Sequence, residues 1–234
     1  MKHALLSAAA ALALSFAAGS ANAVTFATAG DTASLDFNGI VDGVVDLDLD
    51  ADLTLTLLSI TGSFDYNFSY SLSNNSAGDD LLSRLTAFGF NVNPDFDDAT
   101  VSGEFDQWAS GNVPGGLPDV EFCASDNTNN CSGGGGDGVA VGETGTGFLT
   151  LSFLVDPGAG GIDLTNFYVR YQSLGPDGEG SGVGRGVPCV NGDCGGGGGN
   201  EIPEPGTWAL MILGFGGAGA MLRRNRRSLA KLAA

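Results

Sequence analysis

Apolar and polar residues alternate along most of the middle of the chain. Between Val45 and Leu57 every odd position is apolar, and between Phe64 and Leu72 every even position is aromatic or leucine. Alternate side chains of a β-strand point to opposite faces, so each segment predicts a strand with one buried face. The same reasoning predicts further strands at residues 85–92, 148–155 and 167–173.

Turn-forming residues separate the predicted strands. They are Asn74-Asn75, Pro94-Asp95, Pro114-Gly115-Gly116, Asp156-Pro157-Gly158 and Pro176-Asp177-Gly178. Proline lacks a backbone donor and glycine adopts turn conformations freely, so both end regular structure. No segment between the two ends of the chain has a sustained helical period. Residues 24–190 are therefore predicted to form one all-β domain, an antiparallel, jelly-roll-like β-sandwich.

Residues 1–23 have the features of a signal peptide. A positively charged start precedes an apolar, alanine-rich stretch, and Ala21 and Ala23 supply small residues at the two positions that define a cleavage site. Such a segment directs export and is then removed, whereas a retained anchor would need a longer apolar stretch. We expect a helical signal segment that is cleaved after Ala23. The only histidine of the chain, His3, leaves with it.

An apolar stretch, Trp208–Leu222, forms a second membrane-directed segment. Its 15 residues would span ~22 Å as a helix, which is short of the ~30 Å hydrocarbon core. Trp208 at one interface and long arginine side chains at the other extend this span. Because positive residues stay on the cytoplasmic side, we expect one short transmembrane helix with the preceding domain facing the periplasm. The arginines that stop transfer are Arg223, Arg224, Arg226 and Arg227.

The residues around this stretch match a known pattern. Pro203-Glu204-Pro205, two further residues, Trp208-Ala209, an apolar stretch with Gly-Phe-Gly and a final arginine cluster resemble the PEP-CTERM sorting signal. The resemblance implies recognition of Pro203, Glu204, Pro205 and Trp208 by an exosortase, an integral membrane cysteine peptidase. It also implies cleavage near the motif and transfer to the cell surface or the exopolysaccharide of a Gram-negative bacterium. The tail is also labelled an ice-binding protein C-terminal domain, a name that says little about ice.

These segments give the expected domain organisation. Glycine-rich residues 191–202 are predicted to be a linker, because glycine runs bury no side chain and lose much entropy on ordering. The sorting signal covers residues 203–227, and residues 228–234 are a cytoplasmic tail. The protein is thus expected to cross the inner membrane, to be anchored there transiently, and to end at the cell surface or in the extracellular matrix.

The middle of the chain is strongly acidic. Residues 24–202 contain 26 acidic and three basic residues, a net charge of −23. A nucleic-acid-binding surface needs clustered lysine and arginine, so this class of partner is excluded. Extracellular polysaccharide remains as an expected partner besides the exosortase and the inner membrane.

Four cysteines fall into two local pairs. An even number of cysteines in an exported protein favours disulfides, and neither pair has the spacing of a zinc site. Four cysteines allow three pairings, and we favour local ones because each pair brackets a polar or glycine-containing loop. The predicted pairs are Cys123 with Cys131 and Cys189 with Cys194.

The mature chain lacks histidine, which excludes Ser–His–Asp and Cys–His catalysis because no imidazole can accept the proton of a nucleophile. Only a mechanism with two carboxyl groups, as in glycoside hydrolysis, stays open. The best candidates for such catalytic carboxyl groups are Glu104, Glu121 and Glu143. Nothing in the sequence distinguishes them from a solvated surface, so we expect a non-catalytic protein without a cofactor.

Asp46, Asp48, Asp50 and Asp52 form an acidic row. An EF-hand loop counted from Asp46 would need glycine and glutamate at its sixth and twelfth positions, which are alanine and leucine here. On a strand these carboxylates would stand on one face, ~7 Å apart, and keep that face hydrated. No metal site is predicted, although a diffuse calcium contact stays open here and in the turns at residues 93–98 and 126–130.

Several aromatic residues could form a platform for sugars. They are Tyr66, Tyr70, Trp108, Tyr168 and Tyr171. Tyr66 and Tyr70 share the parity of Phe68 and are assigned to the core, whereas Trp108 has no such constraint. The sequence thus predicts an exported, non-catalytic surface or matrix protein, associated with the exopolysaccharide of a biofilm. The alternatives are a carboxylate-dependent glycan hydrolase and a calcium-stabilised adhesin.

Overall fold

A computed structural model describes residues 23–189 except residue 63 and residues 127–129 and 135–136. Within this part the fold is all-β and contains no helix, as predicted, and so no helix able to span a membrane. The chain separates into two units, Met1–Gly197 and Gly198–Ala234, and the described residues all belong to the first. The predicted signal helix, linker, transmembrane helix and cytoplasmic tail lie outside the described residues.

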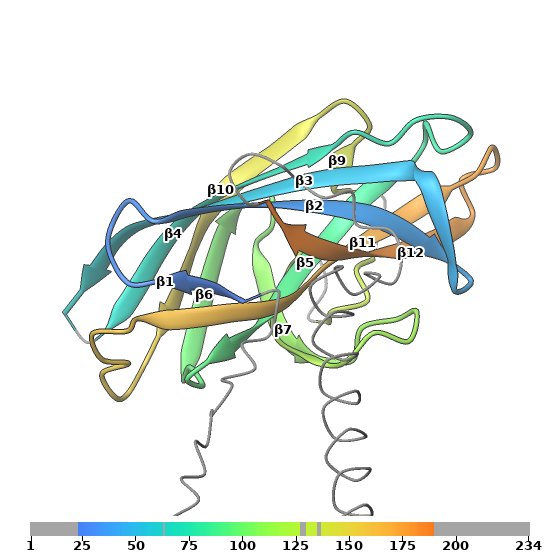
Figure 1. Cartoon of the computed structure of the whole chain (residues 1–234). Coiled ribbons are helices and arrows are strands. Elements are labelled where there is room, and N and C mark those ends of the chain that lie inside the picture. Colours follow the sequence, from blue (N-terminus) through green and yellow to red (C-terminus); the bar gives the residue numbers. More distant parts are fainter. Residues whose placement is uncertain (1–22, 63, 127–129, 135–136, 190–234) are drawn as a thin grey trace, which may run out of the picture. The chain divides into compact units, whose positions relative to one another are not determined.

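Twelve strands make up the described part (Figure 1). They are β1 (Val24–Phe26), β2 (Thr32–Val41), β3 (Val44–Thr61), β4 (Asp65–Asn74), β5 (Arg84–Asn93), β6 (Asp98–Gly103), β7 (Gln107–Gly111), β8 (Val120–Ser125), β9 (Val139–Ala140), β10 (Thr144–Ser152), β11 (Ile162–Leu174) and β12 (Gly180–Pro188).

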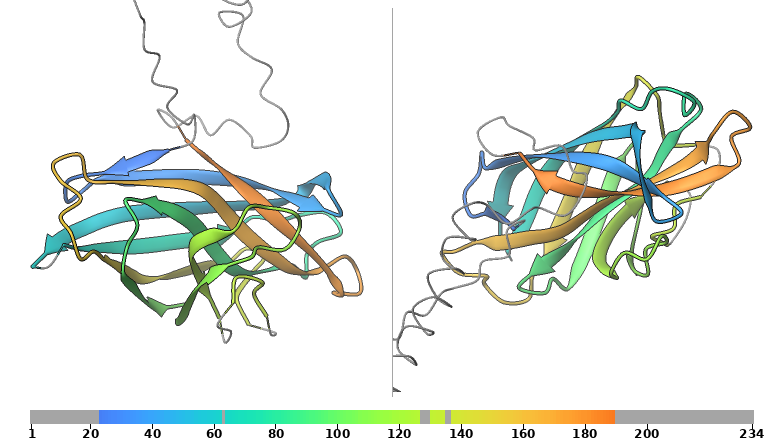
Figure 2. Two further views of the ribbon diagram at one scale, coloured as in Figure 1. Left: turned by 90° about the horizontal axis from the view of Figure 1, so that it is seen from below. Right: turned by 45° about the vertical axis from the view of Figure 1, so that its right-hand side comes forward.

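All twelve strands belong to one antiparallel sheet. Its order is β6-β10-β4-β3-β2-β12-β11-β5-β8-β7, with β1 paired to β11 and β9 paired to β5. The sheet folds over, so that β10, β4, β3 and β2 form one layer and β11, β5, β8 and β7 the other (Figures 1 and 2). The antiparallel β fold is confirmed, and its two layers are halves of one hydrogen-bonded sheet.

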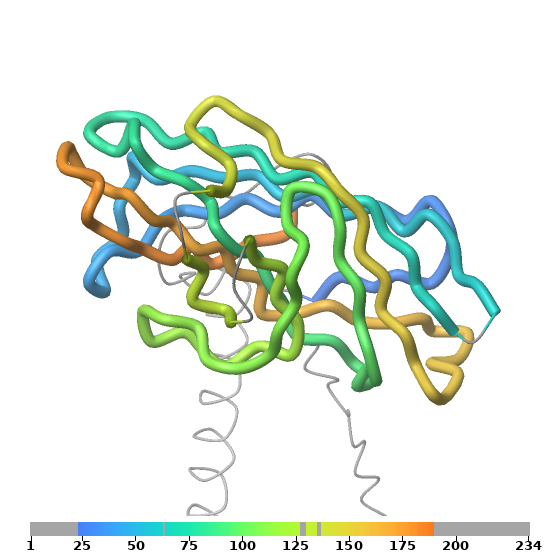
Figure 3. The backbone as a smooth tube through the Cα atoms, turned by 180° about the vertical axis from the view of Figure 1, so that it is seen from behind, coloured from blue at the N-terminus to red at the C-terminus, as the bar shows by residue number. Residues whose placement is uncertain are grey.

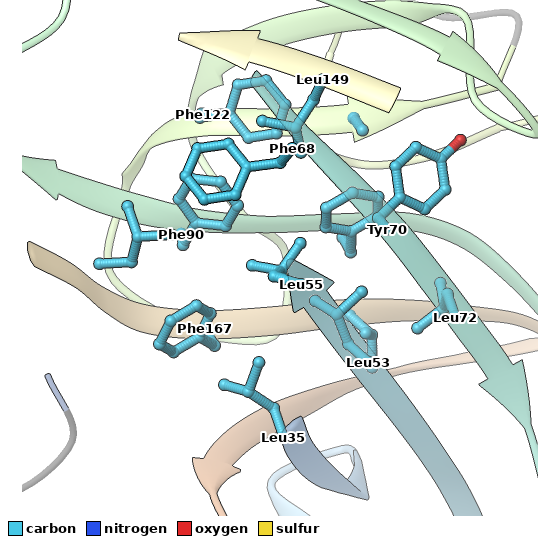
Figure 4. Packing of buried hydrophobic residues seen from close by; sticks show 14 of the residues in the cluster. Leu35, Leu53, Leu55, Phe68, Tyr70, Leu72, Phe90, Phe122, Leu149 and Phe167 are labelled. Atoms are coloured by element: carbon cyan, nitrogen blue, oxygen red, sulfur yellow. The ribbon is translucent and has the colours of Figure 1, made fainter. Parts of the chain in front are cut away.

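The core lies between the two layers and follows the alternation in the sequence. In β3 the odd positions from Leu49 to Leu57 are buried, and in β4 the even positions from Tyr66 to Leu72 are buried. Side chains of both layers meet there, as in Figure 4, where Phe68 and Leu55 of one layer lie near Phe90 and Phe167 of the other. Tyr66 and Tyr70 are core residues, as their parity predicts.

The prediction of burial is wrong at two places. Val45 and Leu47 are 42% and 78% exposed, because the first residues of β3 extend past the core as the tip of the β2–β3 hairpin. A bulge opposite Asn38 and Gly39 then resets the register. The predicted strand at residues 148–155 also runs too far, since β10 ends at Ser152.

Both outer edges of the sheet lie at one side of the fold. β6 pairs only with β10 and β7 pairs only with β8, and the chain passes directly from one to the other (Figure 3). Between these two strands Phe105 is fully buried against Tyr70 and Phe88. The Phe105 backbone N–H also donates to the Tyr70 hydroxyl at 3.0 Å. The two layers are therefore joined at this side by a buried ring instead of a ladder of hydrogen bonds.

Candidate functional site

Two neighbouring hollows flank the loop between β5 and β6. Their volumes are about 340 and 320 Å³, and both are lined by Asp95, Phe96 and Asp97. We call them together the Phe96 groove. Its lining residues are Pro94, Asp95, Phe96, Asp97, Trp108, Ser110, Glu121, Leu154, Val155, Asp156 and Pro157.

Aromatic rings form one side of the groove. Trp108 of β7 is partly exposed and lies parallel to the buried ring of Phe122, with ring centroids 6.5 Å apart and an interplanar angle of 13°. Phe96 packs at an angle against Trp108 with centroids 5.7 Å apart. Phe122 in turn stacks on Phe90 at 4.9 Å within the core. The exposed rings are thus held by a continuous stack of buried rings.

Carboxylates lie at the rim of the groove, and two of them are tied to the backbone. Glu121 accepts a hydrogen bond from the Val92 N–H at 2.6 Å, just beyond the last β5–β8 ladder pair. Asp156 accepts one from the Gly158 N–H at 2.8 Å. Asp95 and Asp97 are exposed, and within the described part their side chains accept no hydrogen bond, so both carboxylates are available to a ligand.

The other side of the groove carries exposed apolar side chains. Leu154 and Val155 are 79% and 76% exposed, directly after the buried Phe153. Their exposure is the physical outcome of the early end of β10, which leaves them in the turn before Asp156-Pro157. The sequence pattern assigned both residues to the predicted strand at residues 148–155. Apolar residues beside a turn motif, as at Leu154 and at Phe96 after Pro94, were the signal that could have located the groove.

The three glutamates considered for hydrolysis lie in different places. Glu121 lines the Phe96 groove near Asp95 and Asp97, whereas Glu104 and Glu143 are exposed and line neither hollow. The groove therefore combines ring faces, exposed apolar side chains and carboxylates. Such a concave surface can bind an extended ligand that has both apolar faces and polar groups.

The other tyrosines proposed as a sugar platform do not line the Phe96 groove. Tyr168 and Tyr171 are buried in β11, where burial raises the pKa of both phenols. Their hydroxyls donate to backbone carbonyls, at 3.2 Å to Cys131 and at 3.2 Å to Phe37. Of the five aromatic candidates, Trp108 is the one that lines the groove.

The predicted acidic row meets another aspartate across the sheet. Asp52 of β3 lies directly opposite Asp36 of β2. Burial, followed by repulsion from Asp50 and Asp52, raises the pKa of Asp36. Burial and repulsion from Asp52 raise the pKa of Asp50, against a smaller lowering effect of Asn75. Among the described residues, no group of three or more metal-ligating side chains is placed to hold a metal ion.

One predicted disulfide is confirmed. Cys123 of β8 is bonded to Cys131, with the two Cα atoms 5.7 Å apart. Cys189 is also disulfide-bonded, while Cys194, its predicted partner, lies outside the described residues.

The residues of the predicted export signals lie outside the described part of the chain. These are Ala21 of the signal cleavage site, the motif residues Pro203, Glu204, Pro205 and Trp208, and Arg223, Arg224, Arg226 and Arg227. Ala23 is the first described residue and is exposed.

Comparison with known proteins finds a family motif near the C-terminal end of the chain. No curated protein and no solved structure matches the chain. A model of the PEP-CTERM protein-sorting motif matches residues 201–227, which include Pro203-Glu204-Pro205 and the arginine cluster. Proteins with this motif are exported and processed by an exosortase. The chain therefore carries a PEP-CTERM sorting motif, as the resemblance of its sequence implied.

Proposed function

We propose that the chain is a non-catalytic surface protein that an exosortase releases from the inner membrane into the exopolysaccharide matrix. The observation that carries the proposal is the sorting motif at residues 201–227. The signal peptide predicted at residues 1–23 would start export, and the motif would end it. The β domain between them is the part delivered outside.

Two properties of the β domain support this destination. Its disulfide between Cys123 and Cys131 is of a kind that persists in oxidising compartments outside the cytoplasm. Its strong negative charge keeps copies of the domain apart and soluble, and it disfavours adsorption to anionic lipid head groups. Both properties suit a protein that accumulates at a cell surface.

The sorting step is tested by replacing Pro203, Glu204 and Pro205 with alanine in a host that contains an exosortase. The full-length variant should remain in the inner-membrane fraction, because the peptidase can no longer recognise it. The matched control replaces residues 197–199 of the glycine run with alanine and should be processed normally. Immunoblots of membrane, surface and medium fractions give the readout. Normal processing of the motif variant would contradict exosortase sorting.

A second candidate function is carboxylate-dependent glycan hydrolysis. It is favoured by the position of Glu121 in the same groove as Asp95 and Asp97. A reducing-sugar assay on the purified chain, with polysaccharide from the producing cells as substrate, separates the two functions. Sugar release that is lost in Glu121→Gln and kept in Glu143→Gln would establish a hydrolase and overturn the non-catalytic proposal.

A further inference from the structure

We propose that the Phe96 groove binds an extended chain of amino sugars that carry free ammonium groups, such as a glucosamine polymer. The inference rests on the proposed function, because it assumes that the domain works among polysaccharides. It names the class of polysaccharide that the groove fits.

The apolar surface of the groove suits sugar rings. A pyranose presents C–H groups on its faces, and these pack against flat aromatic or exposed aliphatic side chains. Trp108 and Phe96 offer ring surface, and Leu154 and Val155 continue the apolar surface at more than three-quarters exposure. Within the described part the indole N–H of Trp108 donates no hydrogen bond, so it can donate to a sugar hydroxyl.

The charges of the groove select against acidic sugars. Its lining contains four carboxylates, and none of its lining residues is basic. The three arginines of the described part line neither hollow, and two of them donate to backbone carbonyls elsewhere, Arg84 to Gly138 and Arg170 to Ser132. A uronic acid or a phosphorylated sugar would meet only like charges. An ammonium group would be attracted, and it is also favoured over an aromatic face.

The groove is held in shape before any ligand binds. The Asp97 N–H donates to the Ser152 carbonyl at 2.8 Å, which fixes the β5–β6 loop beside β10. Glu121 is fixed by its bond from Val92, and Trp108 rests on Phe122. Because little ordering remains to be done, the loss of entropy on binding is small.

The two adjoining hollows favour a polymer over a single sugar. The two hollows share Asp95, Phe96 and Asp97 as lining residues. A chain that passes Phe96 can occupy both hollows at once, with ammonium groups near the two free carboxylates. A monosaccharide would fill one hollow and use half of the contacts.

The test measures binding of the purified full chain, in mild detergent, to three oligosaccharides of equal length by calorimetry. They are a glucosamine hexamer, its fully N-acetylated form and a galacturonate hexamer. At about 0.15 M salt, where distant charges are screened, the glucosamine hexamer should bind at least about tenfold more tightly than either of the others. Equal binding of the acetylated hexamer, or no binding of the glucosamine hexamer, would overturn the proposal.

Two double variants that remove the same charge distinguish binding in the groove from non-specific attraction by the acidic domain. Asp95→Asn with Asp97→Asn should weaken binding of the glucosamine hexamer about tenfold or more. Asp36→Asn with Asp52→Asn removes the same charge from the β2–β3 face and should change binding less than about twofold. An equal loss in both pairs would mean non-specific attraction of a polycation and would overturn the proposal.

A ring substitution completes the test. Trp108→Ala should abolish detectable binding, while Trp108→Phe, which keeps an aromatic face, should retain part of it. Far-UV circular dichroism checks that both variants keep their strand signal, and the phenylalanine variant serves if the alanine variant does not fold. Unchanged binding in a folded Trp108 variant would overturn the proposal. If the groove proposal fails, the sorting proposal is unaffected, because sorting is measured separately by the processing of the Pro203-Glu204-Pro205 variant in cells.

Discussion

The indole ring of Trp108 lies parallel to the ring of Phe122, at an interplanar angle of 13° and a centroid distance of 6.5 Å. Phe122 is fully buried and also contacts Phe90 and Phe88. One residue of β8 therefore links the exposed ring of the groove to the centre of the core. Stability of the domain and shape of the groove depend on the same side chain.

Phe122→Ala should lower the free energy of unfolding by about 3–5 kcal/mol, because it removes a buried ring and leaves a cavity among its aromatic neighbours. Urea unfolding followed by circular dichroism measures the change. Phe148→Ala is the control, since Phe148 is 59% exposed on β10, and it should change stability by no more than about 0.5 kcal/mol. Similar losses in the two variants would contradict the role given to Phe122.

Gly186→Ala should destabilise the domain by about 1–3 kcal/mol, because a Cβ at this position would lie 2.5 Å from the Phe37 ring and 2.8 Å from the Phe167 Cβ. Both neighbours are buried and have little room to move. The melting temperature gives the readout. Gly160→Ala serves as control, because a Cβ there meets no atom within 4 Å. The prediction fails if the melting temperatures of the two variants agree.

The charge of Asp36 should destabilise the folded domain at neutral pH. Its pKa is raised in the folded state by burial and by Asp50 and Asp52, so the folded state holds the proton more tightly than the unfolded chain. The stabilising contribution of protonated Asp36 to the folded state is present at low pH and is lost as pH rises through the folded pKa. Asp36→Asn should therefore raise the melting temperature by about 1–3 °C at pH 7, and the gain should vanish below about pH 4.

The charge of Asp31 should have the opposite effect and stabilise the folded domain at neutral pH. The backbone N–H groups of Thr28 and Ala27, followed by the Thr28 hydroxyl, donate to its carboxylate and lower its pKa. The associated stability is present above the unfolded pKa and is lost as pH falls through the folded pKa. Asp31→Asn should therefore lower the melting temperature at pH 7, with a smaller effect in acid. Melting curves of both variants from pH 3 to 7, about the range in which carboxylates titrate, give the readout, and a shift of both variants in the same direction at pH 7 would contradict one of the two predictions.

Removal of the Cys123–Cys131 disulfide should lower stability by about 2 kcal/mol, near the lower end of the usual range because only eight positions separate the two cysteines. Other contacts continue to hold the loop, since the Tyr168 hydroxyl donates to the Cys131 carbonyl and Arg170 Nε to the Ser132 carbonyl. The double serine variant should thus stay folded. Its melting temperature is compared with that of the oxidised parent protein and of the parent in reductant, and an unchanged value would show that the bridge constrains nothing.

The alternation of side chains predicted β3, β4, β5, β10 and β11, and it left the other seven strands unpredicted, β2 with its buried Leu35 and Phe37 among them. It missed β12, whose inward positions Gly182, Gly184 and Gly186 give no hydrophobic signal. Their space is taken by side chains of other strands, such as Phe37 and Tyr171 near Gly184. A strand that is buried under its neighbours' side chains can be recognised only when those neighbours are known.

The groove was less predictable than the fold. Trp108 and Glu121 were both candidates, but for separate functions, and no spacing in the sequence relates them to Phe96 or Leu154. The turn at residues 93–98 was considered only for a calcium contact of its aspartates, whereas Asp95, Phe96 and Asp97 together line both hollows. Which loops meet at one end of a sandwich depends on the order of strands in the sheet, and local patterning does not encode that order.

The place of β12 within the sheet sets an order of events during secretion. This last described strand lies between β2 and β11, with Arg185 opposite both Asn38 and Tyr168. The edges of β2 and β11 that face β12 therefore stay unpaired until residues 180–188 have crossed the membrane. Contacts of such long sequence separation also form slowly. Only the twelve residues 189–200 separate Pro188 from the sorting motif at residues 201–227. In the proposed export route, completion of the fold and arrival of the motif at the exosortase would therefore fall close together, and a slowly folding variant would reach the peptidase before its sheet is complete.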